Sequence, residues 1–254
     1  MKRNDWRLIN GEHYEALPCA LVRGRGNYVK RLLSKAEWLV RRKSDGRYLA
    51  VGTNDWLQTF KRDAKLQQAC EQFYFNQDSF SPEKSLPKLQ LILDSLGIPA
   101  SYGVQHQLEL IPEPTSLQFA GFDRYQRPLW MQADAALAWR KMQKHAAGDD
   151  ILLDAISGYR GHAYQYGIFK RKLARGQSVQ EILKVNAAPG YSEHHSGRAI
   201  DIGTPNEAPA DESFESTTAF IWLMKNAEEF GFRLSYPRNN PHDINYEPWH
   251  WYYT

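Results

Sequence analysis

The chain has 254 residues, of which 42% are hydrophobic and 24% are charged, so it is long and apolar enough for a packed core and is not a wholly disordered protein. The formal net charge of +3 is too small to indicate a nucleic-acid partner, and we expect none. The two cysteines, Cys19 and Cys70, are too few for a disulfide scaffold and lack the spacing of a cysteine metal site.

The amino terminus is charged from Lys2 to Asp5, and no apolar run follows it. Such a start does not resemble a secretory signal, and no stretch is long and apolar enough to span a bilayer. We therefore expect no transmembrane segment and a protein that is cytoplasmic as written, unless a signal was removed or export follows an unseen route.

Residues 1–100 are predicted to form a smaller α+β region of unassigned function. They hold 17 Lys and Arg against 11 Asp and Glu, whereas the remainder holds 15 against 18. A basic balance favours either an anionic partner or, more simply, a solvated surface. The elements that we expect here are a hairpin over 37–51 turning at Asp45-Gly46, a helix over 55–75 capped by Asn54, a linker over 79–87, and a short helix through Leu89, Leu93 and Leu96 that ends at Gly97.

Residues 101–254 are predicted to form the main domain. Helices and strands mix there without a regular βαβ repeat, which indicates an α+β fold with a small antiparallel sheet flanked by helices. The expected strands are 106–111, 116–122, 151–156, 198–203, 232–236 and 246–253, and the expected helices are 132–147, 162–175, 178–185 and 214–230.

Two stretches concentrate residues that bind metals. One runs from Ser192 to Asp201 and includes His194, and the other includes Glu247 and His250. Two imidazoles and a carboxylate are a common ligand set for catalytic zinc, and a further carboxylate can carry the proton. A histidine taken singly is more often an ordinary polar residue, and we assign that status to His13, His106, His145 and His162.

The joint pattern resembles a known family. Ser192-x-His194-x-x-Gly197-x-Ala199-x-Asp201, followed by Glu247-x-Trp249-His250, resembles the signature of the VanY-type D-alanyl-D-alanine carboxypeptidases, zinc peptidases with the lysostaphin, D-Ala-D-Ala peptidase and hedgehog-like fold. Ser157-Gly158-Tyr159-Arg160, with Gln165 five residues on, resembles the substrate-side motif of that family. The resemblance covers residues 101–254 and does not extend to residues 1–100.

The resemblance implies a role for each matched residue. His194, Asp201 and His250 would hold Zn²⁺, and Glu247 would be the general base and then the acid. Arg160 would bind the substrate or polarise the peptide near the scissile carbonyl, while Gln165 and Ser192 would support substrate binding. His195 is left open, either as a hydrogen-bonding neighbour of the site or as a competing ligand, and His242 is a weaker candidate.

The spacing of Glu247 and His250 poses a geometric problem. Residues three apart on a regular strand point to opposite faces. Pro248 lies between them, and proline is confined to strand starts, edges and bulges. We therefore expect Glu247 to lie just outside the strand, with His250 facing the cleft and Trp251 facing away from it.

The function that these observations favour is that of a zinc metallocarboxypeptidase. It would remove the C-terminal D-amino acid, most simply D-Ala, from peptidoglycan stem peptides, precursors or muropeptides. One alternative is an endolysin-type endopeptidase that cuts within the stem peptide. A second is a non-catalytic zinc-binding protein of the same fold, against which the intact Glu247 argues.

Overall fold

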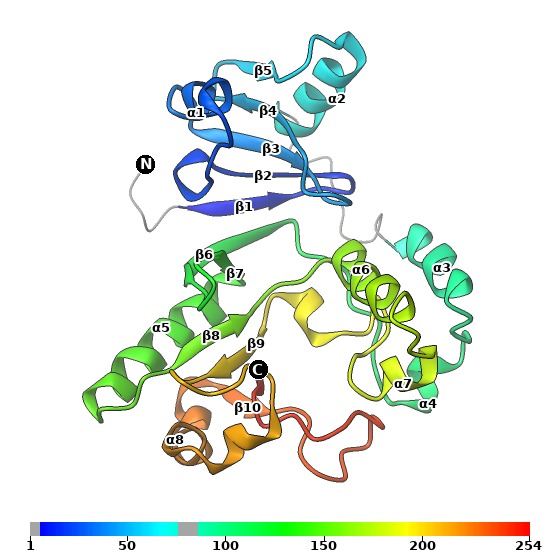
Figure 1. Ribbon diagram of the computed structural model, residues 1–254, viewed down its shortest axis with the longest axis vertical. Coiled ribbons are helices and arrows are strands. Elements are labelled where there is room, and N and C mark those ends of the chain that lie inside the picture. The colour runs from blue at the N-terminus through cyan, green and yellow to red at the C-terminus, as the bar shows by residue number, and fades with distance from the viewer. Residues whose placement is uncertain (1–5, 76–85) are drawn as a thin grey trace.

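Two antiparallel sheets organise the chain in the computed structural model, which describes residues 6–75 and 86–254 (Figure 1). Within this described part, the first sheet has seven strands in the order β5-β4-β3-β2-β1-β6-β7, and the second has four in the order β10-β11-β9-β8. The strands are β1 (Arg7–Asn10), β2 (Tyr14–Pro18), β3 (Trp38–Arg42), β4 (Tyr48–Gly52), β5 (Leu57–Thr59), β6 (Ser116–Phe122), β7 (Pro128–Met131), β8 (Asp154–Ser157), β9 (Ala199–Gly203), β10 (Phe232–Leu234) and β11 (His250–Tyr253). The predicted α+β class is confirmed.

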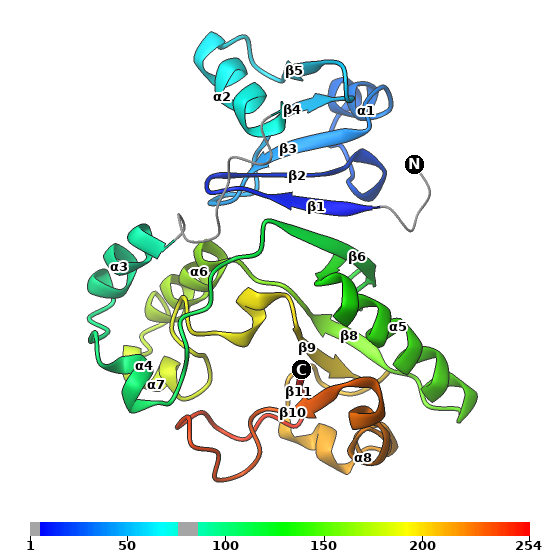
Figure 2. The same cartoon turned by 180° about the vertical axis from the view of Figure 1, so that it is seen from behind.

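Helices cover both sheets, and α5 and α8 lie beside the second one (Figure 2). The α-helices are α1 (Asn27–Leu33), α2 (Ala64–Phe75), α3 (Leu86–Ser95), α4 (Tyr102–Gln105), α5 (Ala133–Gly148), α6 (His162–Leu173), α7 (Val179–Leu183) and α8 (Thr218–Asn226). The 3₁₀ helices are η2 (Cys19–Leu21), η5 (Glu193–Ser196), η6 (Glu212–Ser216) and η7 (Ala227–Phe230). Among the described residues, no helix has both the length and the apolar character needed to cross a membrane.

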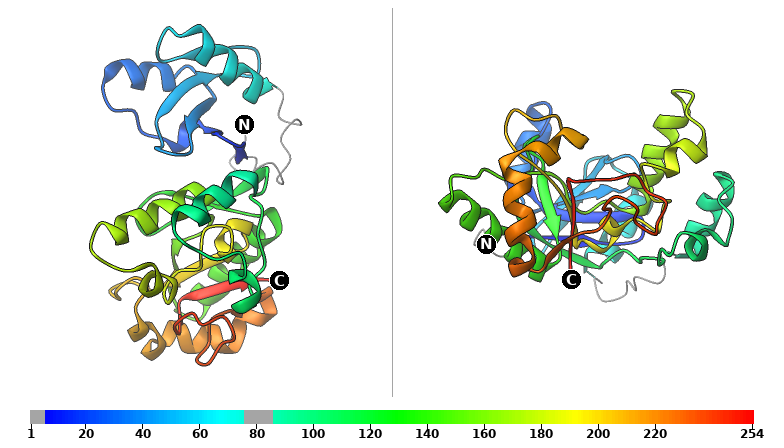
Figure 3. Two further views of the ribbon diagram at one scale, coloured as in Figure 1. Left: turned by 90° about the vertical axis from the view of Figure 1, so that its right-hand side faces the viewer. Right: turned by 90° about the horizontal axis from the view of Figure 1, so that it is seen from below.

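The first sheet contains strands from both predicted regions. β1 pairs with β6 in antiparallel register, with Leu8 opposite Leu117. The strands and helices of residues 6–75 gather at one end of the molecule, and the second sheet lies at the other (Figure 3). The division at residue 100 stays a prediction, and strand pairing continues across it.

The amino-terminal hairpin is confirmed, but the predicted helix over 55–75 is wrong at its start. Gly46 has a φ of +69° in the turn between β3 and β4. Asn54 caps no helix, because residues 57–59 form β5 at the sheet edge. The helix begins at Ala64 instead, where the Asp63 side chain accepts a hydrogen bond from the backbone N–H of Leu66.

Further predicted elements differ in part from the structure. The strand expected over 106–111 is absent, because α4 ends at Gln105 and Ile111 forms one backbone bond to Gly190 instead of a ladder. The helix expected over 214–230 is divided: α8 starts after the Thr217 cap, and η7 completes the segment before Gly231. The predicted linker over 79–87 falls largely on residues 76–85, which lie outside the described residues.

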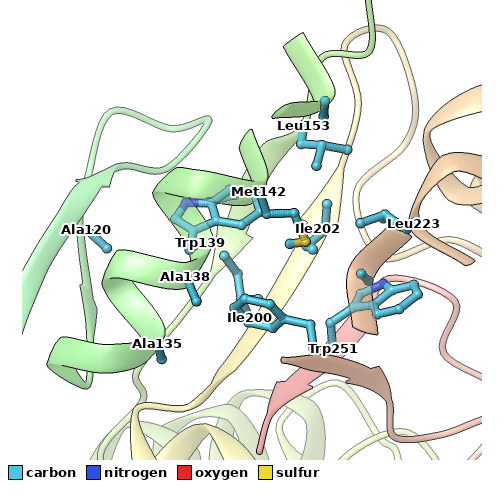
Figure 4. Packing of buried hydrophobic residues seen from close by; sticks show 14 of the residues in the cluster. Ala120, Ala135, Ala138, Trp139, Met142, Leu153, Ile200, Ile202, Leu223 and Trp251 are labelled. Carbon is cyan, nitrogen blue, oxygen red and sulfur yellow. The ribbon is translucent and has the colours of Figure 1, made fainter. Parts of the chain in front are cut away.

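The core of the second sheet decides where its polar residues point. Ile200 and Ile202 of β9 and Trp251 of β11 are buried among side chains of α5 and α8, including Trp139 and Leu223 (Figure 4). Side chains alternate along a strand, so the residues between these inward positions lie on the other face.

Candidate metal centre

The pairing of β9 with β11 forms the base of the site. Asp201 lies directly opposite His250 in this antiparallel register. Ile200 and Trp251, the neighbours of these residues, are in the core, so Asp201 and His250 share the opposite face of the sheet. Directly paired residues have Cβ atoms about 5 Å apart, which is close enough for their side chains to meet one ion.

His194 reaches the same face from η5. Gly197 ends this 3₁₀ helix with a φ of +74°, a left-handed conformation that glycine adopts without strain. A Cβ at this position would lie 2.4 Å from the Leu117 side chain, so the close approach also requires glycine. One ligand atom from each of His194, Asp201 and His250 lies within 4.8 Å of the others, and all three residues are buried.

Each imidazole is oriented by a hydrogen bond on its outer nitrogen. His194 Nδ1 donates to the carbonyl of Gly158 at 2.7 Å, so its Nε2 presents a lone pair to Asp201 Oδ1 at 3.2 Å. His250 Nε2 donates to Glu193 Oε2 at 2.8 Å, so its Nδ1 faces the same Asp201 oxygen at 3.1 Å. His194 Nε2 and His250 Nδ1 therefore converge on one carboxylate oxygen.

This donor set fits a divalent transition metal ion. His194 Nε2 is buried without a hydrogen-bond partner, and a cation would satisfy it. Burial lowers the pKa of His194 to about 4, so its ring is neutral near pH 7, as a metal ligand must be. Two imidazoles and a carboxylate are a set that catalytic zinc sites use, with a further position left for water.

Glu193 is a site residue that the sequence interpretation missed. Its carboxylate accepts the hydrogen bond of His250 and pairs with Arg233 at 3.2 Å. A carboxylate behind a ligating imidazole fixes the ring and raises its basicity. Burial opposes the charge of His250, but the bonds to Asp201 and Glu193 outweigh it and raise the pKa of this imidazole to about 10, so a metal ion that binds Nδ1 would displace a proton from it. An acidic residue next to the ligand His194 was the available signal.

Glu247 lies beside the centre and outside the regular strand. β11 begins at His250, as the proline argument predicted, and Glu247 Oε2 is 3.9 Å from His250 Nδ1. Burial, which disfavours the charged carboxylate, raises the pKa of Glu247 to about 7. A carboxyl group with this pKa can both accept and donate a proton near neutral pH.

Arg160 approaches the centre from the segment between β8 and α6. Its Nη1 is 3.8 Å from Asp201 Oδ2, and its Nε is buried without a hydrogen-bond partner. The backbone N–H of Arg160 donates to the carbonyl of His194 at 3.2 Å, which ties this segment to η5. The guanidinium therefore lies next to the ligand cluster, and at least its Nε–H is available as a hydrogen-bond donor.

The structure limits what two other histidines can do. His195 Nδ1 donates to the carbonyl of Arg160 at 2.6 Å, and its Nε2 accepts from the N–H of Gly190 at 3.0 Å. Since both nitrogens are engaged, His195 supports the Arg160 segment and has no free lone pair for a metal. His242 instead exchanges hydrogen bonds with His106, each ring donating to the other's carbonyl.

The two predicted substrate residues are both buried. Gln165 donates to the carbonyl of Ala187 at 2.9 Å, and its Oε1 has no hydrogen-bond partner. Ser192 stands at the N-cap position of η5, where its carbonyl accepts from the N–H of His195. A substrate-binding role for either residue stays a prediction.

Comparison with known proteins gives one family. The VanY family model, described as D-alanyl-D-alanine carboxypeptidase, matches residues 128–254. YodJ of Bacillus subtilis (strain 168), a carboxypeptidase by provisional assignment, is 31% identical over 192 residues that cover 72% of this chain and 69% of YodJ. The bifunctional D-Ala-D-Ala dipeptidase and carboxypeptidase VanXYC of Enterococcus gallinarum is 29% identical over 59% of this chain and 79% of that protein. Among solved structures, the LdcB LD-carboxypeptidase is 34% identical, with a TM-score of 0.46, over 49% of this chain and 59% of that one.

Proposed function

Since the chain belongs to the VanY family of D-alanyl-D-alanine carboxypeptidases, we propose that it is a zinc-dependent carboxypeptidase that removes the C-terminal D-amino acid, D-Ala first, from peptidoglycan stem peptides, precursors or muropeptides. The observation that carries the proposal is the convergence of His194, Asp201 and His250 beside the buried Glu247.

His194 Nε2, one oxygen of Asp201 and His250 Nδ1 would hold the zinc ion. When bound, the ion supplies Lewis-acid chemistry that acidifies water and polarises a carbonyl. Glu193 and the Gly158 carbonyl keep the two imidazoles in the ligating tautomer.

Glu247 and Arg160 would carry the chemistry of the chain itself. Glu247 takes the proton of the attacking water on its carboxylate and then gives it to the leaving amine. A pKa of about 7 for Glu247 suits both transfers. The Arg160 guanidinium donates to the oxygen of the scissile carbonyl, where negative charge develops as water adds.

The test combines metal analysis with a peptide digest. Glu247→Gln should retain the metal content of the wild-type protein and lose at least about 100-fold in turnover of a stem peptide ending in D-Ala-D-Ala, since positioned proton transfer contributes that much or more. Glu229→Gln, which removes an exposed carboxylate from η7, is the matched control and should leave both unchanged.

The same digest separates the alternatives by product mass. Loss of one alanine from the free-acid peptide, but not from its C-terminal amide, supports a carboxypeptidase. Equal cleavage of the amide would indicate an endopeptidase, and wild-type protein that binds zinc but cuts neither peptide would indicate a binding protein. Undiminished turnover by Glu247→Gln would remove Glu247 from the reaction.

A further inference from the structure

A large groove lies where the first sheet meets the catalytic segments, and we call it the junction groove. Its volume is about 940 Å³, within the range of ligand sites. One side is formed by β1, β2 and the loop after η2, and the other by the β6–β7 turn and by residues 157–161. The first of these sides precedes residue 128, where the match to the VanY family begins.

Basic side chains outnumber acidic ones in the lining of the junction groove. Six basic side chains line it, against the two carboxylates of Glu15 and Asp123. Both carboxylates are already neutralised, Glu15 by Arg41 at 2.6 Å and Asp123 by Arg127 at 2.6 Å. Lys43 pairs with Glu113, and Arg160 lies 3.8 Å from Asp201. Among the described lining residues, the positive charge without an ion-pair partner is therefore that of Arg23 and Arg25.

Arg23 and Arg25 carry the least compensated part of this charge. Both are exposed, and within the described part of the chain neither side chain takes part in an ion pair or a hydrogen bond. Each guanidinium group offers planar pairs of donors that match the oxygens of a carboxylate or phosphate.

The junction groove shares a wall with the proposed active site. Arg160 lines the groove and also approaches Asp201, at 3.8 Å. The carbonyls of Gly158 and Arg160, on the same segment, hold His194 and His195 by hydrogen bonds. A peptide whose C-terminal residue lies beside Arg160 would therefore have its preceding residues next to the groove.

The exposed Arg23 and Arg25 and the segment that carries Arg160 thus line the same groove. We propose that the junction groove binds the acidic part of the peptide substrate that precedes the scissile bond, with Arg23 and Arg25 pairing with its carboxylates. This inference rests on the proposed peptidase function. A peptide is favoured over a phosphate polymer because the groove includes the segment that carries Arg160, which also approaches the proposed active site.

The test uses two peptides that end in D-Ala-D-Ala and differ only in one preceding glutamate or glutamine. Wild-type enzyme should hydrolyse the glutamate peptide with a kcat/KM about 3–10-fold higher, mainly through KM, because exposed charge pairs contribute modestly. The double variant R23Q/R25Q should lose this preference. The matched control K141Q/K144Q, which removes two exposed charges from α5, should keep it.

Several results would overturn the inference. An unchanged preference in R23Q/R25Q would do so, as would the absence of a preference in the wild type. So would R23Q/R25Q weakening the binding of a soluble polyphosphodiester while leaving the peptide pair unaffected. If the wild type cuts neither peptide, the proposed function fails instead, and calorimetric binding of the two peptides then tests the inference. The inference is supported if wild type and K141Q/K144Q bind the glutamate peptide more tightly than the glutamine peptide and R23Q/R25Q does not. Equal binding of the two peptides by the wild type refutes it.

Discussion

Glu113 joins the amino-terminal sheet to the catalytic segment, and Glu113→Gln should weaken that junction. Glu113 is only 3% exposed. It accepts hydrogen bonds from Asn10 of β1 at 3.1 Å, from the Tyr159 hydroxyl at 2.7 Å and from the His162 N–H at 2.7 Å, and it forms an ion pair with Lys43. One side chain thus connects three separate parts of the chain.

The structure sets the size of the effect. A glutamine keeps the shape but removes the charge, which leaves the Lys43 ammonium unpaired with a side chain only 10% exposed. Breaking a buried pair in this way costs about 3–5 kcal/mol in the free energy of unfolding. At about 2–4 °C for each kcal/mol in a protein of this size, Tm should fall by about 6–20 °C.

The effect should also depend on pH in one direction. Burial disfavours the charge of Glu113, but Lys43 and His162 outweigh it and hold the pKa of Glu113 well below its usual range. A depressed carboxyl pKa stabilises the folded protein fully above the unfolded pKa, about 4.3, and this contribution is lost as the pH falls. The difference in Tm between wild type and Glu113→Gln should therefore be full at pH 7 and shrink below about pH 4.

Thermal unfolding followed by circular dichroism at pH 7 and below about pH 4 measures this difference in Tm. The control is Asp243→Asn, because the ion pair of Asp243 with Lys184 is more than half exposed and should contribute no more than about 1 kcal/mol. Lys43→Met added to Glu113→Gln should recover part of the loss, since it removes the unpaired charge. A Glu113→Gln protein that melts within about 2 °C of wild type at pH 7 would refute the reasoning.

Two further predictions concern the metal centre. Glu193→Gln should weaken metal binding by about 10–100-fold, measured by competition with a chelator, because Glu193 orients the His250 ring. An unchanged metal affinity would show that other contacts hold the ring. His194→Ala should lose the metal, whereas His195→Ala should keep it and lose turnover through the Arg160 segment; metal loss of the same size in both would contradict the structural role of His195.

Much of the centre could be predicted from the sequence because its residues lie in two short stretches that resemble the paired motifs of the VanY family. The spacing of Glu247 and His250 across Pro248 even placed one of them outside the strand, as the structure confirms. Glu193 could not be assigned in this way, because its role depends on which nitrogen of His250 faces Asp201. That choice follows from strand register and ring orientation, which residue spacing does not encode.

In the amino-terminal region, local sequence signals predicted the secondary structure less well than the paired motifs predicted the metal centre. Asn54 is a good capping residue followed by a helical spacing, yet Leu57 to Thr59 pair with β4 as an edge strand. Hydrogen bonds between β5 and the preceding strand β4 outweighed local helix propensity, and the helix began only after Asp63. The pairing of β1 with β6 was likewise invisible, because it joins residues more than 100 positions apart.

Side chains alternate between the two faces of β9 and β11, so the same strand pairing forms both the core and the metal centre. Ile200, Ile202 and Trp251 occupy the buried face, and this fixes Asp201 and His250 on the other face without any separate device. A slip of one residue in either strand would place a ligand in the core and an apolar side chain at the centre. The packing that excludes such a slip therefore also sets the distances between the ligands, so the centre needs only η5 and Gly197 to bring His194 into place.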